Sequence, residues 1–113
     1  MDIRIESRGD VKIVAPNAAL LDGAEIELLE AATPLLAERG CRVVLDLRDV
    51  ESLNSSGLGV LVQLGARANL QGGTLALARP TAYVSGVLEM TQLTKFFRVF
   101  GELDDAVRAL QAA

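Results

Sequence analysis

Hydrophobic and polar positions divide the chain into short strands and helices. Residues 3–7 alternate between apolar or small side chains and charged ones, which predicts a half-buried strand. Gly9-Asp10 is a favourable hairpin turn, and residues 11–15 repeat the alternation as a second strand. Pro16-Asn17 is expected to break that strand. Two antiparallel strands are therefore predicted at the start of the chain.

A strand, a polar loop and a helix are predicted over residues 43–64, the segment around which the other elements are arranged. Residues 43–47 form a short apolar run with two β-branched side chains, which suits a strand buried on both faces. Charged and polar residues follow at 48–52 and are expected to form a tight loop. Apolar residues then return at helical spacing, so a helix is predicted from about Ser55 to Leu70.

The predicted helix begins within the sequence Asn54-Ser55-Ser56-Gly57-Leu58-Gly59. The first N–H groups of a helix lack intrahelical partners. A serine there is therefore either a plain cap or a hydroxyl at which the positive end of the helix dipole would stabilise a phosphate. Gly57 and Gly59 keep side chains out of the way, so that a partner's backbone or a nucleotide could approach closely.

One stripe of this helix is expected to face solvent. Ser56, Gly59, Val60, Gln63 and Arg67 fall along the same line at helical spacing. The few polar side chains of an otherwise apolar helix lie on this stripe, which favours exposure of the face that bears the serine. An exposed stripe with a glycine and a valine could dock a partner.

A first helix is predicted to follow Asp22-Gly23-Ala24-Glu25, which resembles a capping box. Pro34 lies inside the apolar pattern of this helix, so a kink is expected near Glu30. Gly40 is expected to end the segment. Asp22 is interpreted as a structural cap that could also border the serine loop, since both would lie at loop ends of the same sheet.

Strands and helices continue to alternate in the second half of the chain. Residues 74–78 predict a strand, Pro80-Thr81 begins a short helix, residues 95–100 predict a last strand, and Asp104-Asp105 suits the first turn of a C-terminal helix. A chain of 113 residues without repeats or linkers fits one domain, residues 1–113. We therefore expect a single-domain α/β fold, with a mixed sheet of about four to five strands and about four helices.

Composition argues against several classes of function. The chain has no histidine, so a Ser-His-Asp triad is impossible, and a zinc ion would have only one cysteine and carboxylates as ligands. Lys12 and Lys95 are the only lysines, and both fall in peripheral or strand segments, so an enzyme is not expected. The formal charge is −4 with no basic cluster, which argues against a nucleic-acid partner.

The same data predict a reducing compartment. Cys41 is the sole cysteine, which rules out an internal disulfide. The chain does not start with a basic-then-apolar signal pattern, and no apolar run approaches the roughly 20 residues of a membrane span. We therefore expect a cytoplasmic protein that is not inserted in a membrane and that uses no cofactor or metal.

The order of these elements, together with the segments 46–50 and 54–60, resembles a STAS domain. That family is named after sulfate transporters and anti-sigma-factor antagonists. The resemblance covers nearly the whole chain, including Leu21-Asp22 and residues 92–96, and the serine motif is specific because it follows a buried strand and opens a helix. In bacterial antagonists the motif usually reads Asp-Ser-Ser/Thr-Gly-Leu-Gly, so Asn54 departs from it and removes a charge beside the first serine.

The resemblance implies an anti-sigma-factor antagonist that acts by partner switching. The unphosphorylated protein would bind an anti-sigma factor that is also a serine kinase, and so free the sigma factor. Phosphorylation of Ser55, or alternatively of Ser56, would break the complex, and a PP2C-type phosphatase would reset it. ATP and magnesium would belong to the kinase. The partner-binding residues implied are Asp22, Asn54, Ser56, Gly57, Gly59, Val60 and Gln63.

Two other functions are open at this point. The same fold could serve as a non-phosphorylated scaffold, for example as the small subunit of a lipid-transport assembly or of a signalling complex. A nucleotide-binding module could also use a glycine-flanked helix start, but no Walker lysine follows Gly59.

Overall fold

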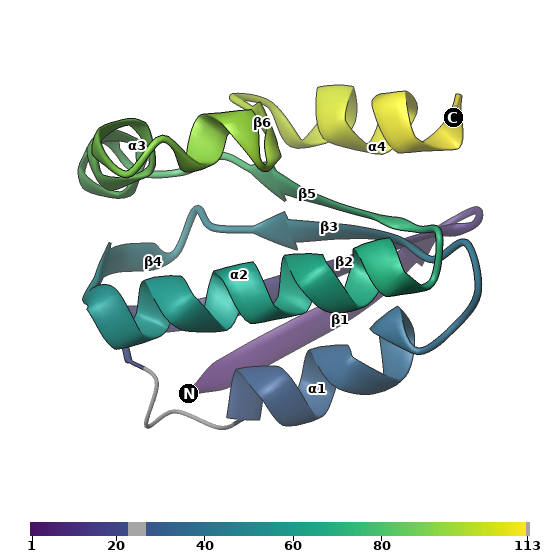
Figure 1. The fold of residues 1–113 in the computed structure, drawn as a ribbon, viewed down its shortest axis with the longest axis horizontal. Coiled ribbons are helices and arrows are strands. Elements are labelled where there is room, and N and C mark those ends of the chain that lie inside the picture. Colours follow the sequence, from purple (N-terminus) through teal and green to yellow (C-terminus); the bar gives the residue numbers. More distant parts are fainter. Residues whose placement is uncertain (23–26, 113) are drawn as a thin grey trace.

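The computed structural model describes residues 1–22 and 27–112. Within these residues the chain forms a mixed β-sheet with helices on both sides (Figure 1). The elements in chain order are β1 (Asp2–Arg8), β2 (Val11–Leu21), α1 (Glu27–Leu36), β3 (Arg42–Asp46), β4 (Val50–Leu53), α2 (Ser55–Leu70), β5 (Thr74–Ala78), α3 (Ala82–Met90), the 3-10 helix η1 (Leu93–Lys95), β6 (Arg98–Phe100) and α4 (Leu103–Gln111). The predicted α/β class and the predicted helix over residues 55–70 agree with this architecture.

The predicted hairpin at the start of the chain is confirmed. β1 and β2 are antiparallel with Arg8 opposite Val11, so Gly9-Asp10 is a two-residue turn. Gly9 has φ 61°, a left-handed value that glycine adopts without steric cost and that the first position of a type II′ turn requires. β1 is more exposed than the predicted half-buried strand, because it lies at one end of the strand order.

The predicted break at Pro16 is wrong, because β2 runs on to Leu21. β2 changes partner at this point. On one side it pairs in parallel with β3 through Val14, and from Ala18 onward it pairs in parallel with β4. Pro16 lies between these two stretches, so neither β3 nor β4 needs a backbone N–H from β2 there.

The polar loop predicted over residues 48–52 is also wrong in part, because it contains strand β4. Val50 and Leu53 are buried at the two ends of β4, whereas Glu51 between them is exposed. Four residues are too few for the alternation to show as a pattern, and the charged residues at 48, 49 and 51 hide it in the sequence. β4 carries the chain directly to the start of α2.

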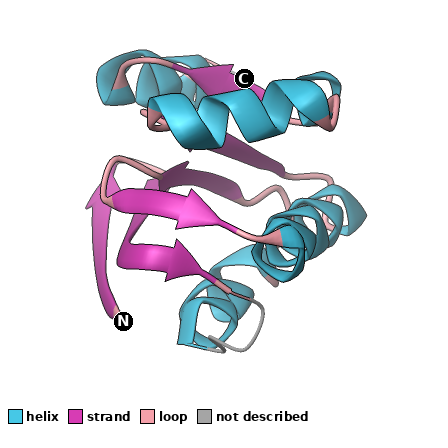
Figure 2. Cartoon of the chain, turned by 90° about the vertical axis from the view of Figure 1, so that its left-hand side faces the viewer, coloured by secondary structure: helices cyan, strands magenta, loops and turns pink. Residues whose placement is uncertain are grey.

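The strands of the sheet follow the order β1-β2-β3-β5-β6, with β4 paired to β2. All pairs except β1–β2 are parallel. Helices α1 and α2 cover one face and α4 covers the other, so the strands lie between two helical layers (Figure 2). β3 is buried on both faces, as its apolar run predicts.

Each face of the sheet has its own hydrophobic cluster. The larger cluster contains buried leucines of α1 and α2, together with Val84 and Leu88 of α3. The smaller one packs Leu103, Val107 and Leu110 of α4 against the sheet. Most of the buried side chains are aliphatic, in keeping with a chain that has few aromatic residues.

Some helix boundaries differ from those predicted. Pro34 lies inside α1 as expected, but α1 ends at Leu36, and Gly40 occupies a turn four residues later with φ 68°. The strand predicted over residues 95–100 is reduced to β6, because η1 ends at Lys95 and residues 96–97 form a turn before the strand. The capping box predicted at 22–25 extends into residues outside the described ranges, and the kink near Glu30 stays a prediction.

Candidate functional site

Asn54 is the N-cap of α2, so the interpretation of a serine as the cap is wrong. Its backbone is extended, with φ −102° and ψ −177°, and its side-chain oxygen accepts a hydrogen bond of 2.9 Å from the N–H of Gly57. The carbonyl of Asn54 accepts the first intrahelical bond, 2.9 Å from the nitrogen of Leu58. Ser55 and Ser56 are therefore the first two residues of the helix itself, and their hydroxyls are not required for capping.

The start of α2 is fixed against the end of β2. Leu53 of β4 lies opposite Leu21 of β2, and the N–H of Asn54 donates to the carbonyl of Leu21 at 3.3 Å. A Cβ on Gly57 would overlap the Leu21 oxygen and would lie 2.8 Å from its carbonyl carbon. Gly57 is therefore required by the close approach of this chain's own backbone, and the expectation that it leaves room for a partner is wrong.

Most of the predicted stripe on α2 is exposed. Ser56, Gly59, Gln63 and Arg67 are exposed, as is Ser55 before them, and a Cβ on Gly59 would meet no atom within 4 Å. Val60 is the exception: it is 5% exposed and belongs to the larger hydrophobic cluster, so its predicted exposure is wrong. Val60 is one residue beyond Gly59 around the helix, and that rotation of about 100° is enough to bring it to the core side of the helix.

Asp22 lies beside the serine loop, as predicted. It follows Leu21 directly and is half-buried, and its backbone nitrogen would lie 3.4 Å from a Cβ on Gly57. The parallel pairing of β2 with β4 brings these two segments together, although 35 residues separate Asp22 from Gly57 in the sequence. The structure therefore groups Asp22, Asn54 and the two serines at one end of the sheet. Whether Asp22 contacts a partner stays a prediction.

The serines occupy the positive end of a helix that is 16 residues long. The first turn of α2 contains no acidic side chain, so no carboxylate on the helix itself neutralises the dipole there. A phosphate on Ser55 would be stabilised by the same partial positive charge. The geometry therefore favours an anionic group at this site without any further change in the helix.

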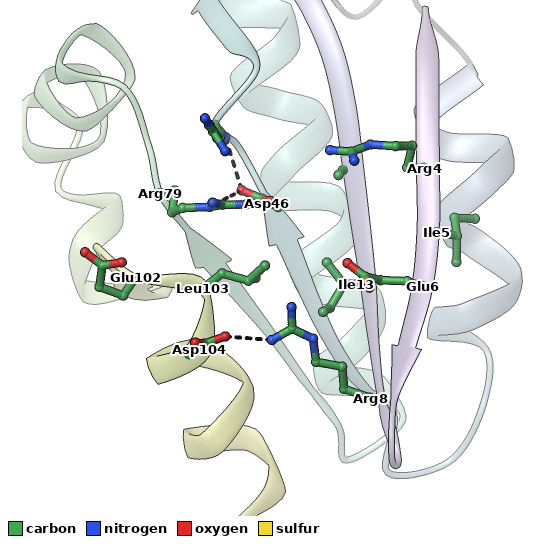
Figure 3. A pocket seen from close by; sticks show the side chains of 12 residues that line it. Arg4, Ile5, Glu6, Arg8, Ile13, Asp46, Arg79, Glu102, Leu103 and Asp104 are labelled. Atoms are coloured by element: carbon green, nitrogen blue, oxygen red, sulfur yellow. Dashed lines mark hydrogen bonds and ion pairs between the residues drawn. The ribbon is translucent and has the colours of Figure 1, made fainter.

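A second polar group lies between the sheet and α4 and was not found from the sequence. Asp46, at the end of β3, is only 4% exposed and accepts two hydrogen bonds from Arg79, 2.5 Å from Nη2 and 3.2 Å from Nε (Figure 3). The hydrogen bond to Asp46 is the main cause that raises the pKa of Arg79 above its ordinary value. Arg79 has φ 52°, and its N–H donates to the carbonyl of Phe100.

This pair borders a hollow of about 660 Å³ that β1 and the start of α4 also line. Arginines and carboxylates alternate around it, and the ion pairs among them include Arg8 with Asp104 at 2.7 Å. The signal in the sequence was an aspartate at the end of an apolar strand, but nothing in the sequence indicated that its partner would be Arg79.

The described residues contain neither a cluster of potential metal ligands nor a helix with the length and apolar character that crossing a membrane requires.

Comparison with known proteins identifies the family to which this chain is similar. The model of the STAS domain matches residues 2–106. A "putative anti-sigma factor antagonist" homolog of Thermotoga neapolitana is 30% identical over 103 residues, which cover 90% of this chain and 91% of that protein. The crystal structure of a "putative anti-sigma factor antagonist" of Thermotoga maritima superimposes with a TM-score of 0.85 at 26% identity, over 96% of this chain and 94% of that one.

A third similarity concerns the fold alone. The anti-sigma factor antagonist SpoIIAA in its unphosphorylated form has a TM-score of 0.75 at 14% identity and is covered over 98% of its length. The family model spans every described strand and helix up to the middle of α4, including the serine loop. The chain belongs to the STAS domain family.

Proposed function

We propose that this protein is an anti-sigma-factor antagonist that acts by partner switching through Ser55. The observation that supports this most directly is the division of roles at the start of α2. Asn54 caps the helix, so the exposed Ser55 at its first position is not engaged in capping and is available for modification. In its unphosphorylated form the protein would bind an anti-sigma factor with serine kinase activity.

The surface around Ser55 suits a protein partner. Ser56, Gly59 and Gln63 extend the exposed surface along α2, and the absence of a side chain on Gly59 lets a partner approach the helix backbone. Asp22 borders this surface from the end of β2. Gly57 and Val60 lie beneath it, where they hold α2 against the sheet, and they would affect binding through the position of the helix.

Phosphorylation would act on this surface by charge and bulk. A phosphate on Ser55 adds about −1.5 to −2 charges at neutral pH and several strong hydrogen-bond acceptors. The helix dipole would stabilise this charge within the protein itself. A partner that had packed against an uncharged helix start would have to desolvate the phosphate, which is unfavourable without a matching cation. The complex would dissociate, and a PP2C-type phosphatase would restore binding.

The names of similar proteins support the proposal. Two curated relatives at 30% and 29% identity are named as putative anti-sigma factor antagonists. SpoIIAA, which shares the fold, has been solved in both its unphosphorylated and its phosphorylated form. These descriptions apply to those proteins, and they indicate which activity to test in this one.

The test is incubation with a purified anti-sigma factor of the serine-kinase type and Mg-ATP, followed by mass spectrometry of the modified peptide. We expect one phosphate on Ser55 in the wild type and in Ser56→Ala, and none in Ser55→Ala. Labelling of Ser56 alone would overturn the assignment of the residue. Recovery of the protein in a complex with a transporter ATPase, with Ser55 never modified, would support the scaffold function instead.

Binding gives an independent measurement. In calorimetry, Ser55→Ala should bind the kinase with an affinity close to that of the wild type, because the hydroxyl caps nothing. Ser55→Asp should bind more weakly, because it places a negative charge where the phosphate would be. Equal binding by all three proteins would contradict the switch.

A further inference from the structure

β1 has an open backbone edge. It lies at one end of the strand order and pairs with β2 on one side, and no other strand of the described chain pairs with its second side. The backbone N–H and C=O groups on that side are therefore able to bond to another strand. β1 is seven residues long, which is longer than β3, β4, β5 or β6.

The hairpin turn decides which residues present their backbone to this edge. The two residues that flank a two-residue turn form a hydrogen-bonded pair, and such pairs alternate with non-bonded ones along an antiparallel ladder. Because Arg8 and Val11 flank the turn, Arg8, Glu6, Arg4 and Asp2 bond to β2. The backbone groups of Ile3, Ile5 and Ser7 consequently point to the open edge.

Side chains of β1 are sorted by face in the same alternating way. Arg4, Glu6 and Arg8 project together on the α4 side, whereas Ile5 points to the opposite side (Figure 3). The four even positions read Asp2, Arg4, Glu6, Arg8, so negative and positive charges alternate along one face of the edge. Ile5, at the middle of the strand, is 49% exposed.

We propose that this edge is a self-association surface, on which β1 pairs antiparallel with β1 of a second copy around a twofold axis at Ile5. In that register Arg4 lies opposite Glu6 of the second copy, and Asp2 lies opposite Arg8. Ile5 packs against its own counterpart. The three residues of each strand whose backbone groups point to the open edge are also opposite one another. The backbone hydrogen bonds and the charge pairs therefore favour the same register.

Neighbouring registers are unfavourable. A slip of two residues in one direction places Arg4 against Arg4 and Asp2 against Glu6. A slip of two residues in the other direction places Glu6 against Glu6 and Arg4 against Arg8. Slips of one residue would oppose outward-pointing backbone groups with groups already bonded to β2. The strand is thus complementary to itself in the one register that uses its full length.

The charges are available for such pairing. Among the described residues, Asp2 and Glu6 take part in no ion pair. Arg4 makes only a long contact of 3.9 Å with Asp49, between two exposed side chains. Arg8 donates a hydrogen bond from Nη1 to Asp104 and has further N–H donors on its guanidinium group.

Self-association at β1 and the proposed switch at Ser55 use different strands of the sheet. The hydrogen-bond partner of β4, which leads to Ser55, is β2, and the open edge of β1 lies on the far side of the hairpin from β4. A dimer of this kind would join two sheets into one continuous sheet and would carry two serine sites. The proposal therefore holds or fails separately from the partner switch.

Charge reversal tests the register. We expect sedimentation and light scattering to show the wild type as a concentration-dependent dimer. Arg4→Glu alone places two glutamates opposite each other at both symmetric positions, and Glu6→Arg alone does the same with arginines. Each single variant should raise the dimer dissociation constant at least about tenfold, because two attractive pairs become repulsive. The double variant Arg4→Glu/Glu6→Arg should recover the wild-type constant.

The two single variants provide a stricter test when they are mixed. The glutamate introduced at position 4 of one variant would then face the arginine introduced at position 6 of the other. The unchanged Glu6 of the first variant would likewise face the unchanged Arg4 of the second. A one-to-one heterodimer should therefore form from two proteins that each self-associate more weakly than the wild type.

Glu89→Arg, a reversal at an exposed position of α3, is the matched control and should leave the dimer unchanged. Circular dichroism of each variant checks that the fold is retained. A wild type that stays monomeric at millimolar concentration would overturn the proposal. So would a dimer that both single variants leave intact, because such a dimer would use another surface. Failure of the mixed variants to associate would exclude the register around Ile5.

Discussion

At the scale of single residues, the two glycines of the serine loop have opposite environments. Gly57 lies against the carbonyl of Leu21, where a side chain has no room, whereas a Cβ on Gly59 would project into open space. Both lie inside α2, so the backbone conformation is the same and only the surroundings differ. In the sequence the two positions look equivalent, and only the contact between β2 and α2 separates them.

We therefore expect opposite effects from the same substitution. Gly57→Ala should lower the free energy of unfolding by about 1–3 kcal/mol or more, because the neighbouring atoms are backbone and move only with β2. Gly59→Ala should raise it by up to about 1 kcal/mol, because alanine favours the helix. Urea denaturation of the two variants measures both values. A tolerated Gly57→Ala would contradict the close approach.

The buried carboxylate of Asp46 gives a second residue-scale prediction. Asp46→Asn would leave Arg79 without its charged partner while keeping nearly the same volume. Breaking a buried pair in this way costs about 3–5 kcal/mol, and the partial exposure of Arg79 reduces that cost to about 3 kcal/mol or less. The control is Asp49→Asn, whose contact with Arg4 is long and exposed, and which should change the stability by less than about 0.5 kcal/mol. Urea denaturation of both variants measures the difference.

Because the thiol of Cys41 is buried, we expect the free energy of unfolding to depend on pH in the alkaline range. Burial is the main cause that raises the pKa of its thiol above the ordinary value. The unfolded chain therefore loses this proton at a lower pH than the folded chain does. The contribution to stability is complete below the unfolded pKa and is lost as the pH rises through the folded pKa. Urea titrations at increasing pH should show this loss in the wild type but not in Cys41→Ala.

At the scale of elements, the start of α2 depends on Asn54 alone for its side-chain cap. Asn54→Ala should lower the free energy of unfolding by about 1 kcal/mol. Asn54→Asp should keep the capping bond and add a favourable charge at the positive end of the helix, worth about 0.3–1 kcal/mol at neutral pH. Thermal unfolding compares the two, and a destabilised Asn54→Asp would contradict the cap geometry.

Elements with a long, regular pattern could be predicted from the sequence. The boundaries of α2 and β5 agree with the predicted ones, and the predicted start of α3 at Pro80-Thr81 agrees with the observed N-cap Thr81, because apolar spacing and turn residues mark them. β4 and the second half of β2 could not be predicted. β2 continues through Pro16 only because its partner changes there, and β4 is a strand only because β2 offers it an edge.

In the candidate site, too, some features could be predicted from the local sequence and others could not. The position of Ser55 at the helix start followed from local spacing, and so did the exposure of Ser56 and Gln63. The burial of Val60 depends on which way α2 faces the sheet, which local spacing does not fix. The role of Gly57 likewise depends on a contact between segments that lie far apart in the sequence.

At the scale of the whole molecule, the two proposed surfaces lie on different strands of the sheet. The serine surface lies at the end of β2 and β4, and the open edge of β1 lies on the other side of the hairpin. Variants that disturb one surface should leave the other intact. Kinase binding by the variant Arg4→Glu measures this directly, and we expect an affinity for each protomer equal to that of the wild type.

Gly57 lies against the Leu21 carbonyl, and the N–H of Asn54 donates to the same oxygen, so the start of α2 is held against the end of β2. Under the proposed function, the structural effect of a phosphate on Ser55 should then be local. Amide chemical shifts should change only within the first turn of α2 and beside Asp22. The rate of partner switching would then be set by the kinase and the phosphatase, because phosphorylation would not require a slow conformational change of this chain.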